Sequence, residues 1–316
     1  MKNILVMAAG AVGGYFGGLL SKNNNVVFIA RGEHLRVSQN KGLLIKSENN
    51  GEFTAEGTFV SEISENYIAD LILFCVKEYH NDLAAEIIRP AIGEKTAIMT
   101  LQNGIGSADF LAKMFTSTQI IVGAAYVEAT KTEPGIIEEH GGDSLIKFGP
   151  HNSSVNSHLK MVDVANLFSE SGISNQLIEK IENVIWEKLI FISALSGMTC
   201  ITRSEFSEVI SNPKTKDLTW RLLNESYEVA KAAGAELPES TPSSIMQNFI
   251  ATKDELVSSM HSDLKKGRPI EVKAINGAIS EIARSLRADA PINEFISTAL
   301  DIYNEKARTN SQGTKI

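Results

Sequence analysis

The first 32 residues read as a strand, a glycine-rich turn, a helix and a second strand, and this order leaves few folds open to the chain. An apolar run, Asn3–Met7, is followed by the turn Ala8–Gly14 and by a helical pattern that reaches about Asn23. A second apolar run follows at Val26–Ala30. Two strands joined through a helix pair in parallel, so the opening predicts a βαβ unit.

The turn after the first strand is suited to a pyrophosphate. A helix that starts directly after a buried strand points unpaired N–H groups and the positive end of its dipole at the space above the turn. Gly10 and Gly13 fill the last two places of the dinucleotide fingerprint Gly-x-Gly-x-x-Gly, while Ala8 stands at the first place. Alanine is tolerated there if its φ is negative. The residues expected to hold a cofactor in this turn are Ala8, Ala9, Gly10, Ala11, Val12 and Gly13.

The residue after the second strand indicates which dinucleotide binds. Chains that bind NAD usually place an acid there for the ribose 2′-hydroxyl, whereas a 2′-phosphate requires a cation. This chain has Arg31 and no acid before Glu33. Arginine can bind a phosphate through two parallel hydrogen bonds, so we expect NADP(H). The alternative is that Arg31 is a solvated surface residue.

The first half of the chain has the pattern of a parallel sheet. Apolar runs bounded by turn residues occur at Ile4–Met7, Val26–Ala30, Leu71–Val76, Ala97–Leu101 and Ile120–Tyr126. Helical patterns separate several of these runs, which predicts crossover helices. Lys131–Gly149 alternates around Glu133-Pro134-Gly135 and predicts antiparallel strands at the far edge of the sheet.

The second half has the pattern of helices. After Pro150 the strand signals stop, and helical spacing follows at His151–Ser171, Glu182–Thr199, Pro213–Gly234, Ser243–Leu264, Val272–Leu286 and Asn293–Ala307. We therefore expect an α/β chain of two domains. Residues 1–178 form an NADP-binding, Rossmann-type parallel-sheet domain, and residues 179–316 form an all-helical substrate and catalytic domain.

Composition excludes several classes of function. The net charge of -8 argues against a general nucleic-acid surface. No uninterrupted apolar run reaches the ~20 residues of a membrane span, since Leu71–Val76 and Leu189–Leu195 are both short. A cleaved signal peptide would remove the glycine-rich turn, so we expect a cytoplasmic protein without membrane partners.

The six histidines show no metal-ligand spacing, and no metal is expected. The oligomeric state stays open, with a homodimer as one alternative.

Carbonyl reduction by a nicotinamide leaves negative charge on the substrate oxygen, so such a site needs a proton donor or a cation. Lys188 is the first candidate, because it interrupts a long apolar helical pattern; the alternative is that it snorkels to water or pairs with a nearby acid. Glu271 is the second, although a carboxylate near a helix start can serve as a cap. Lys77 and Asn103 follow predicted strands at the carboxyl edge, where open α/β sheets bind ligands.

Together these motifs resemble the ketopantoate reductase (2-dehydropantoate 2-reductase) family. The motifs, in order, are Ala30-Arg31-Gly32, Cys75-Val76-Lys77, Leu101-Gln102-Asn103-Gly104, Trp186-Glu187-Lys188-Leu189, Ser258-Ser259-Met260 and Glu271 followed by Asn276-Gly277. The resemblance covers nearly the whole chain. It implies an NADPH-dependent reduction of 2-dehydropantoate to pantoate, a step toward pantothenate and coenzyme A.

The resemblance also implies roles for single residues. Lys188 is expected to be the general acid that protonates the ketone oxygen, and Glu271 to bind and orient the substrate. Lys77 and Asn103 are expected near the nicotinamide-ribose end of the cofactor. Ser259 is expected near the substrate carboxylate.

The chain departs from the family one and two helical turns beyond the lysine. Family members with pantoate chemistry tend to carry asparagines there, whereas this chain has Ile192 and Ser196 on the same helix face as Lys188. An apolar residue cannot hydrogen-bond a substrate hydroxyl, which leaves two possibilities. Either a neighbour such as Asn276 compensates, or the substrate is another small 2-oxo acid. A third reading is a non-catalytic NADPH-binding sensor.

Overall fold

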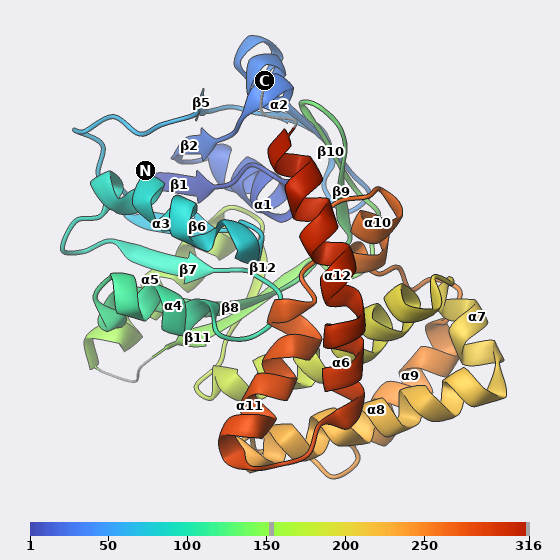
Figure 1. Ribbon diagram of the computed structural model, residues 1–316. Helices are drawn as coiled ribbons and strands as arrows, with labels where there is room; N and C mark the ends of the chain where they lie inside the picture. Colours follow the sequence, from blue (N-terminus) through green and yellow to red (C-terminus); the bar gives the residue numbers. More distant parts are fainter. Residues whose placement is uncertain (152–154, 314–316) are drawn as a thin grey trace. The chain divides into compact units, whose positions relative to one another are not determined.

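The computed structural model describes residues 1–151 and 155–313, and the chain forms two compact units. The first unit contains residues 1–102 and 107–181, and the second contains residues 103–106 and 182–316. Figure 1 shows strands and helices in the first unit and helices in the second. The α/β class with an N-terminal parallel-sheet domain and a C-terminal helical domain is confirmed. The sequence placed the domain boundary after residue 178 and assigned residues 103–106 to the first domain, whereas they belong to the helical unit.

The first unit contains the following elements: β1 (Asn3–Met7), α1 (Ala11–Ser21), β2 (Asn25–Ile29), α2 (Gly32–Lys41), β3 (Leu43–Ser47), β4 (Gly51–Ala55), β5 (Thr58–Val60), β6 (Leu71–Phe74), η1 (Glu78–His80), α3 (Asn81–Ile88), η2 (Arg89–Ala91), β7 (Ala97–Thr100), α4 (Ser107–Met114), η3 (Ser117–Gln119), β8 (Ile120–Tyr126), β9 (Ala129–Glu133), β10 (Ile136–Glu139), β11 (Leu145–Pro150), α5 (Val155–Glu170) and β12 (Ser174–Leu177).

The main sheet has eight strands in the order β12-β11-β8-β7-β6-β1-β2-β5. Its central strands pair in parallel, and β11 pairs antiparallel with β8. The strand β12 was not predicted. Its sequence, Ser-Asn-Gln-Leu, is mostly polar, and because it lies at the sheet edge it lacks the apolar pattern of a buried strand.

The antiparallel strands predicted at Lys131–Gly149 belong to two different sheets. Only β11 joins the main sheet, whereas β9 and β10 form a second, four-stranded sheet of order β4-β3-β10-β9. The prediction of one far edge was therefore wrong for β9 and β10. The reason is that β10 pairs in parallel with β3, a partner about ninety residues earlier in the chain that local periodicity cannot identify.

Helix α1 is packed closely on two sides. A Cβ atom on Gly17 would lie 2.6 Å from Cγ2 of Val6 in β1 and 2.7 Å from Cε1 of Phe28 in β2. A Cβ atom on Gly18 would collide with Ile45 of the second sheet. Neighbouring glycines thus allow α1 to touch both sheets at once, at distances that any side chain would prevent.

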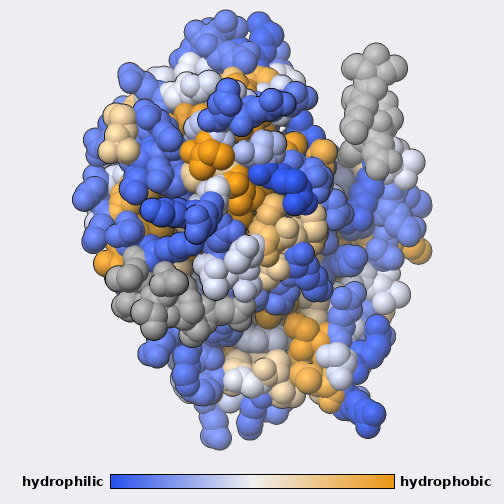
Figure 2. Space-filling model, turned by 90° about the vertical axis from the view of Figure 1, so that its left-hand side faces the viewer, coloured by the Kyte–Doolittle hydropathy of each residue, from blue (hydrophilic) through white to orange (hydrophobic). Residues whose placement is uncertain are grey.

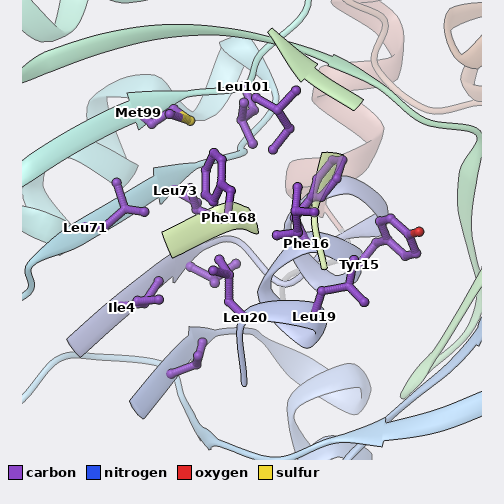
Figure 3. Packing of buried hydrophobic residues seen from close by; sticks show 14 of the residues in the cluster. Ile4, Tyr15, Phe16, Leu19, Leu20, Leu71, Leu73, Met99, Leu101 and Phe168 are labelled. Atoms are coloured by element: carbon purple, nitrogen blue, oxygen red, sulfur yellow. The ribbon is translucent and has the colours of Figure 1, made fainter. Parts of the chain in front are cut away.

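Helices cover both faces of the main sheet. Alternate residues of each central strand enter different clusters: Ile4 and Val6 pack with α1 and α5, while Leu5 and Met7 pack with α3 and α4. Figure 3 shows Phe16 and Leu20 of α1 and Phe168 of α5 close to strand side chains such as Leu73 in the first of these clusters. Burial on both faces explains why these strands read as continuous apolar runs.

The second unit contains the following helices: α6 (Ile181–Thr202), α7 (Phe206–Ser211), α8 (Pro213–Ala232), α9 (Thr241–Thr252), α10 (Ser259–Lys265), η4 (a π-helical turn, Lys273–Gly277), α11 (Ala278–Leu286) and α12 (Pro291–Gly313). The helix predicted at Ser243–Leu264 is two helices, α9 and α10. Ser258 causes a new helix start, because its hydroxyl accepts a hydrogen bond from the N–H of His261 at 3.1 Å.

Helix α6 is longer and more apolar than the short runs within it suggest. It has 22 residues, and an 18-residue window within it has a mean hydropathy of 1.5; among the described helices it is the one long and apolar enough to cross a membrane. The search for an uninterrupted apolar run of ~20 residues did not find this helix, because charged residues near its start interrupt the run. However, 61% of its apolar window is buried inside the structure, as in the core helix of a soluble protein. Hydrophilic residues predominate on the face of the molecule in Figure 2.

The start of α10 generates a test of stability. Ser258 is buried and its hydroxyl also donates to Ser196 Oγ at 3.0 Å, whereas Ser259 is exposed. Ser258→Ala is expected to lower the free energy of unfolding by about 1–2 kcal/mol, because it removes a helix cap and a buried hydrogen bond. Ser259→Ala is the matched control and should change it by less than about 0.5 kcal/mol. Urea unfolding measures both, and equal losses would contradict the assignment of Ser258 as the cap.

Candidate functional site

The glycine-rich turn connects β1 to α1 with the N-terminus of the helix open. Gly10 is the N-cap residue, and among the described residues no side chain caps this end. The first turn of α1 carries no acidic residue. The unpaired N–H groups and the positive end of the helix dipole therefore stay available to an anion.

The two glycines of the turn have different surroundings. A Cβ atom on Gly10 would meet nothing within 4 Å, so this position is bare on its open side. A Cβ atom on Gly13 would collide with the carbonyl oxygen of Ala8 and lie 3.0 Å from Cγ1 of Val6. Gly13 thus serves the packing of helix on strand, and Gly10 leaves space for a ligand.

Alanine at the first fingerprint place is compatible with this turn. Within the described part of the chain, Arg203 and Arg287 are the non-glycine residues with positive φ, so Ala8 has the negative φ that alanine tolerates. The residues present fit a dinucleotide pyrophosphate at this position.

Arg31 lies at the end of β2 as the exposed N-cap residue of α2. Among the described residues its side chain has no ion-pair or hydrogen-bond partner. The nearest acid, Glu33, is bound by both Nε and Nη2 of Arg36, and this hydrogen bonding lowers the pKa of Glu33. A free arginine beside an engaged carboxylate favours a bound phosphate over a ribose hydroxyl.

Lys77 follows β6 and is the N-cap residue of η1. The loop that carries it is fastened by Gln102, a buried residue that sequence reasoning did not single out. Gln102 Nε2 donates to the Val76 carbonyl and to Asn81 Oδ1, both at 2.7 Å. Lys77 is therefore held at the carboxyl edge of the sheet by a residue of the next strand's loop.

Asn103 belongs to the second unit, although it follows a strand of the first. Its segment is bound to η4, because the N–H of Ile105 donates to the Ala274 carbonyl at 3.3 Å. Glu271 is 5% exposed and immediately precedes Val272, the N-cap residue of η4. The structure thus brings the segments of Asn103 and Glu271 to the same π-helical turn, a feature frequent at functional sites.

Lys188, Ile192 and Ser196 lie along one face of α6, at a spacing of four residues. Burial lowers the pKa of Lys188 to about 8 from the ordinary 10.5, because the charged ammonium is poorly solvated there. Ile192 is partly buried beside other apolar side chains, and Ser196 is 5% exposed. Apart from the lysine, this face presents a hydrocarbon and a short hydroxyl.

Two polar groups near this face are partly engaged. Ser196 Oγ accepts a hydrogen bond from Ser258, not from the exposed Ser259 that the sequence motif singled out. Asn276, which is fully buried, donates from Nδ2 to the Ser193 carbonyl at 3.2 Å and to Asn293 Oδ1 at 2.9 Å. The amide N–H groups of Asn276 therefore hold η4 against α6 and α12.

The predicted site residues fall into two sets. The turn Ala8–Gly13, Arg31 and Lys77 lie in the first unit, and Asn103, Lys188, Ile192, Ser196, Ser259 and Glu271 lie in the second. Their roles toward cofactor and substrate stay predictions. In the described part of the chain, no three His, Cys, Asp or Glu side chains are grouped as a metal ion would require.

Known proteins match this chain along most of its length. Residues 4–153 match the family described as ketopantoate reductase PanE/ApbA, and residues 180–304 match the C-terminal part of that family. A 2-dehydropantoate 2-reductase of Nostoc sp. is 25% identical over 312 residues, which cover 98% of this chain and 97% of the relative.

Solved structures share the fold. The crystal structure of 2-dehydropantoate 2-reductase from Geobacter metallireducens has a TM-score of 0.88 and 26% identity, covering 95% of this chain and 99% of that one. A ternary structure of D-mandelate dehydrogenase with NADH and anilino(oxo)acetate has a TM-score of 0.87 and 23% identity, covering 97% and 99%. The two family matches confirm the resemblance seen in the sequence, and this protein belongs to the ketopantoate reductase PanE/ApbA family of oxidoreductases.

Proposed function

We propose that this protein reduces a 2-oxo acid with NADPH as a soluble, cytoplasmic enzyme, and that 2-dehydropantoate is the first candidate substrate. Its product would be pantoate, which leads to pantothenate and coenzyme A. The observation that carries the proposal is Lys188, whose pKa of about 8 lies close to neutral pH. A general acid works best when its pKa is near the working pH, and an ordinary lysine lies well above it. Family membership and the 2-dehydropantoate 2-reductases among the relatives support the same reaction.

The cofactor would be held by the predicted residues of the turn and its neighbours. The open N-terminus of α1 at Gly10 suits the pyrophosphate, and Arg31 suits the 2′-phosphate. Lys77 and Asn103 would contact the nicotinamide-ribose end. The bound nicotinamide supplies the hydride.

The chain's own residues then handle the proton and the substrate. Lys188 holds a proton at Nζ and donates it to the ketone oxygen as negative charge develops there. Glu271 binds and orients the substrate, and Asn103, whose segment is bound to the same turn, would share in this contact. Ser259 would contact the substrate carboxylate.

A second candidate is a 2-oxo acid with an apolar side chain. 2-Dehydropantoate carries a hydroxyl at C4, and a hydroxyl left unpaired in a closed site costs about 1–3 kcal/mol. Ile192 has no hydrogen-bonding atom, which leaves Ser196 as the polar group of this face beyond the lysine; its Oγ accepts from Ser258 and keeps one O–H to donate. The N–H groups of Asn276 are bound to Ser193 and Asn293, so this neighbour offers a hydroxyl only its buried acceptor Oδ1, which has no hydrogen-bond partner among the described residues.

A matched pair of substrates tests the proposal. NADPH oxidation is followed with 2-dehydropantoate and with 3,3-dimethyl-2-oxobutanoate, which lacks only the C4 hydroxyl. A site that hydrogen-bonds the hydroxyl rejects the second acid by orders of magnitude, whereas an apolar site distinguishes the two weakly. A ratio of kcat/KM above about 100 supports 2-dehydropantoate, and a ratio near one or below supports the second candidate.

In the second case, Ile192→Asn should shift the ratio toward the hydroxy acid by about tenfold, the worth of one hydrogen bond. Tight NADPH binding without turnover of any 2-oxo acid would contradict both candidates and indicate a sensor.

Arg31→Ala is expected to weaken NADPH much more than NADH, because only NADPH carries the 2′-phosphate. Loss of a charge-assisted contact predicts a rise in the Kd of NADPH of at least about tenfold. Fluorescence titration of both cofactors measures the effect. The control is Arg36→Ala, which removes an arginine of the same helix that is bound to Glu33. Equal losses of NADPH and NADH in Arg31→Ala would overturn the phosphate assignment.

Lys188→Ala is expected to lower kcat by about 100-fold or more, the usual contribution of a general acid, with the Kd of NADPH nearly unchanged.

In the wild-type protein, reduction requires protonated Lys188. The rate of reduction should therefore be constant below a pH of about 8 and fall as the pH rises through that value. The pH profile of kcat/KM measures this. Lys188→Arg keeps the positive charge but not the transferable proton. This variant should have a low rate of reduction, and that rate should not decrease as the pH rises through about 8. A wild-type profile that stays flat to pH 10 would contradict the role of Lys188.

A further inference from the structure

A buried histidine contacts the back of the glycine-rich turn. His34 lies in the first turn of α2 and is 8% exposed. Its Nε2 is 2.7 Å from the carbonyl oxygen of Ala9, and its Nδ1 is 2.9 Å from the backbone nitrogen of Gly135, between β9 and β10. The imidazole thus joins three segments that are distant in sequence, and the proposed reaction does not use it.

The two contacts fix the protonation of the ring. The N–H of Gly135 can only donate, so Nδ1 is an acceptor and carries no hydrogen. The hydrogen is on Nε2, which donates to the Ala9 carbonyl. Burial, together with the positive charge of Lys131 on β9, lowers the pKa of His34 and favours this neutral form, although the bond to Ala9 acts in the opposite direction.

The bond to His34 completes the attachment of Ala9. The N–H of Ala9 donates to the Ile29 carbonyl at the end of β2, at 2.9 Å. Both polar groups of the Ala9 peptide backbone are therefore held, one by β2 and one by α2. The next residue is Gly10, the N-cap of α1, and Arg31 precedes α2 directly. His34 consequently links the turn proposed for the pyrophosphate to the helix start proposed for the 2′-phosphate.

We propose that His34 is a positioning residue of the cofactor site, which holds the Ala9 carbonyl so that the turn and Arg31 keep a fixed geometry before the dinucleotide binds. This inference rests on the proposed function. Without the bond, the turn would have to be ordered during binding, which weakens affinity.

Two amide variants separate the two bonds of the ring. Glutamine is long enough to place an N–H group at the position of Nε2, so His34→Gln keeps the bond to Ala9. Asparagine is shorter and places its carbonyl oxygen near the position of Nδ1, so His34→Asn keeps the bond to Gly135 and loses Ala9. The matched control is Ser38→Ala, one turn further along α2, because Ser38 Oγ is buried and has no hydrogen-bond partner among the described residues.

The experiment measures the Kd of NADPH and of NADH by fluorescence titration, and the Tm of each cofactor-free variant. We expect His34→Gln and Ser38→Ala to stay within about threefold of the wild-type Kd, and His34→Asn to bind both cofactors about tenfold more weakly, the worth of one hydrogen bond. Equal Kd values for the Gln and Asn variants would overturn the proposal, since a purely structural role predicts no difference between them.

If His34→Asn does not fold, a tenfold loss of affinity in the folded His34→Gln variant overturns the proposal on its own. A wild-type protein that binds neither cofactor overturns the proposed function as well. Wild-type binding with unaffected variants overturns only the role of His34.

Discussion

The packing of α1 between two sheets is the constraint on which the first unit depends. The helix is buried from Gly13 to Leu20, and its glycines bring its backbone against β1 and β2 on one side and against the second sheet on the other. A helix held this tightly has a fixed N-terminus, at Gly10. The position of the turn is therefore a consequence of core packing, and beyond the fingerprint Gly17 serves the main sheet while Gly14 and Gly18 serve the second sheet.

The sequence was sufficient for the features that local pattern determines. The βαβ opening, the parallel strands and most helices follow from apolar runs and helical spacing, which neighbouring residues set. The second sheet depends on the pairing of β10 with β3, and β12 forms by pairing with β11 at the edge of the main sheet. Neither pairing can be recognised from the residues of one segment alone. The hydroxyl of Ser258 caps the start of α10, and the break between α9 and α10 is not visible in the helical periodicity of the sequence.

The residues of the candidate site also divide into those that a local sequence pattern identifies and those that it does not. Lys188, Glu271, Arg31 and the turn could be singled out because each stands at a motif or interrupts a pattern. His34 stands in no motif, and the motifs that contain Gln102 and Ser258 pointed to their neighbours Asn103 and Ser259, because these three residues act through contacts with residues distant in sequence, such as Ala9, Val76 and Ser196. Supporting residues of this kind show in the sequence only as ordinary polar side chains. Their importance lies in which group they hold in place.

The segment 103–106 gives the chain an unusual connectivity. The backbone passes from the first unit to the second after Gln102, returns after Gly106, and passes over again after Ile181. The units are thus joined at three points, and neither is a continuous stretch of sequence. A fragment that ends at residue 181 would carry the Ile105 segment without its Ala274 partner. The remaining helices would lack residues 103–106, which belong to their unit. Recombination between relatives at residue 181 would exchange this loop separately from the helices it binds.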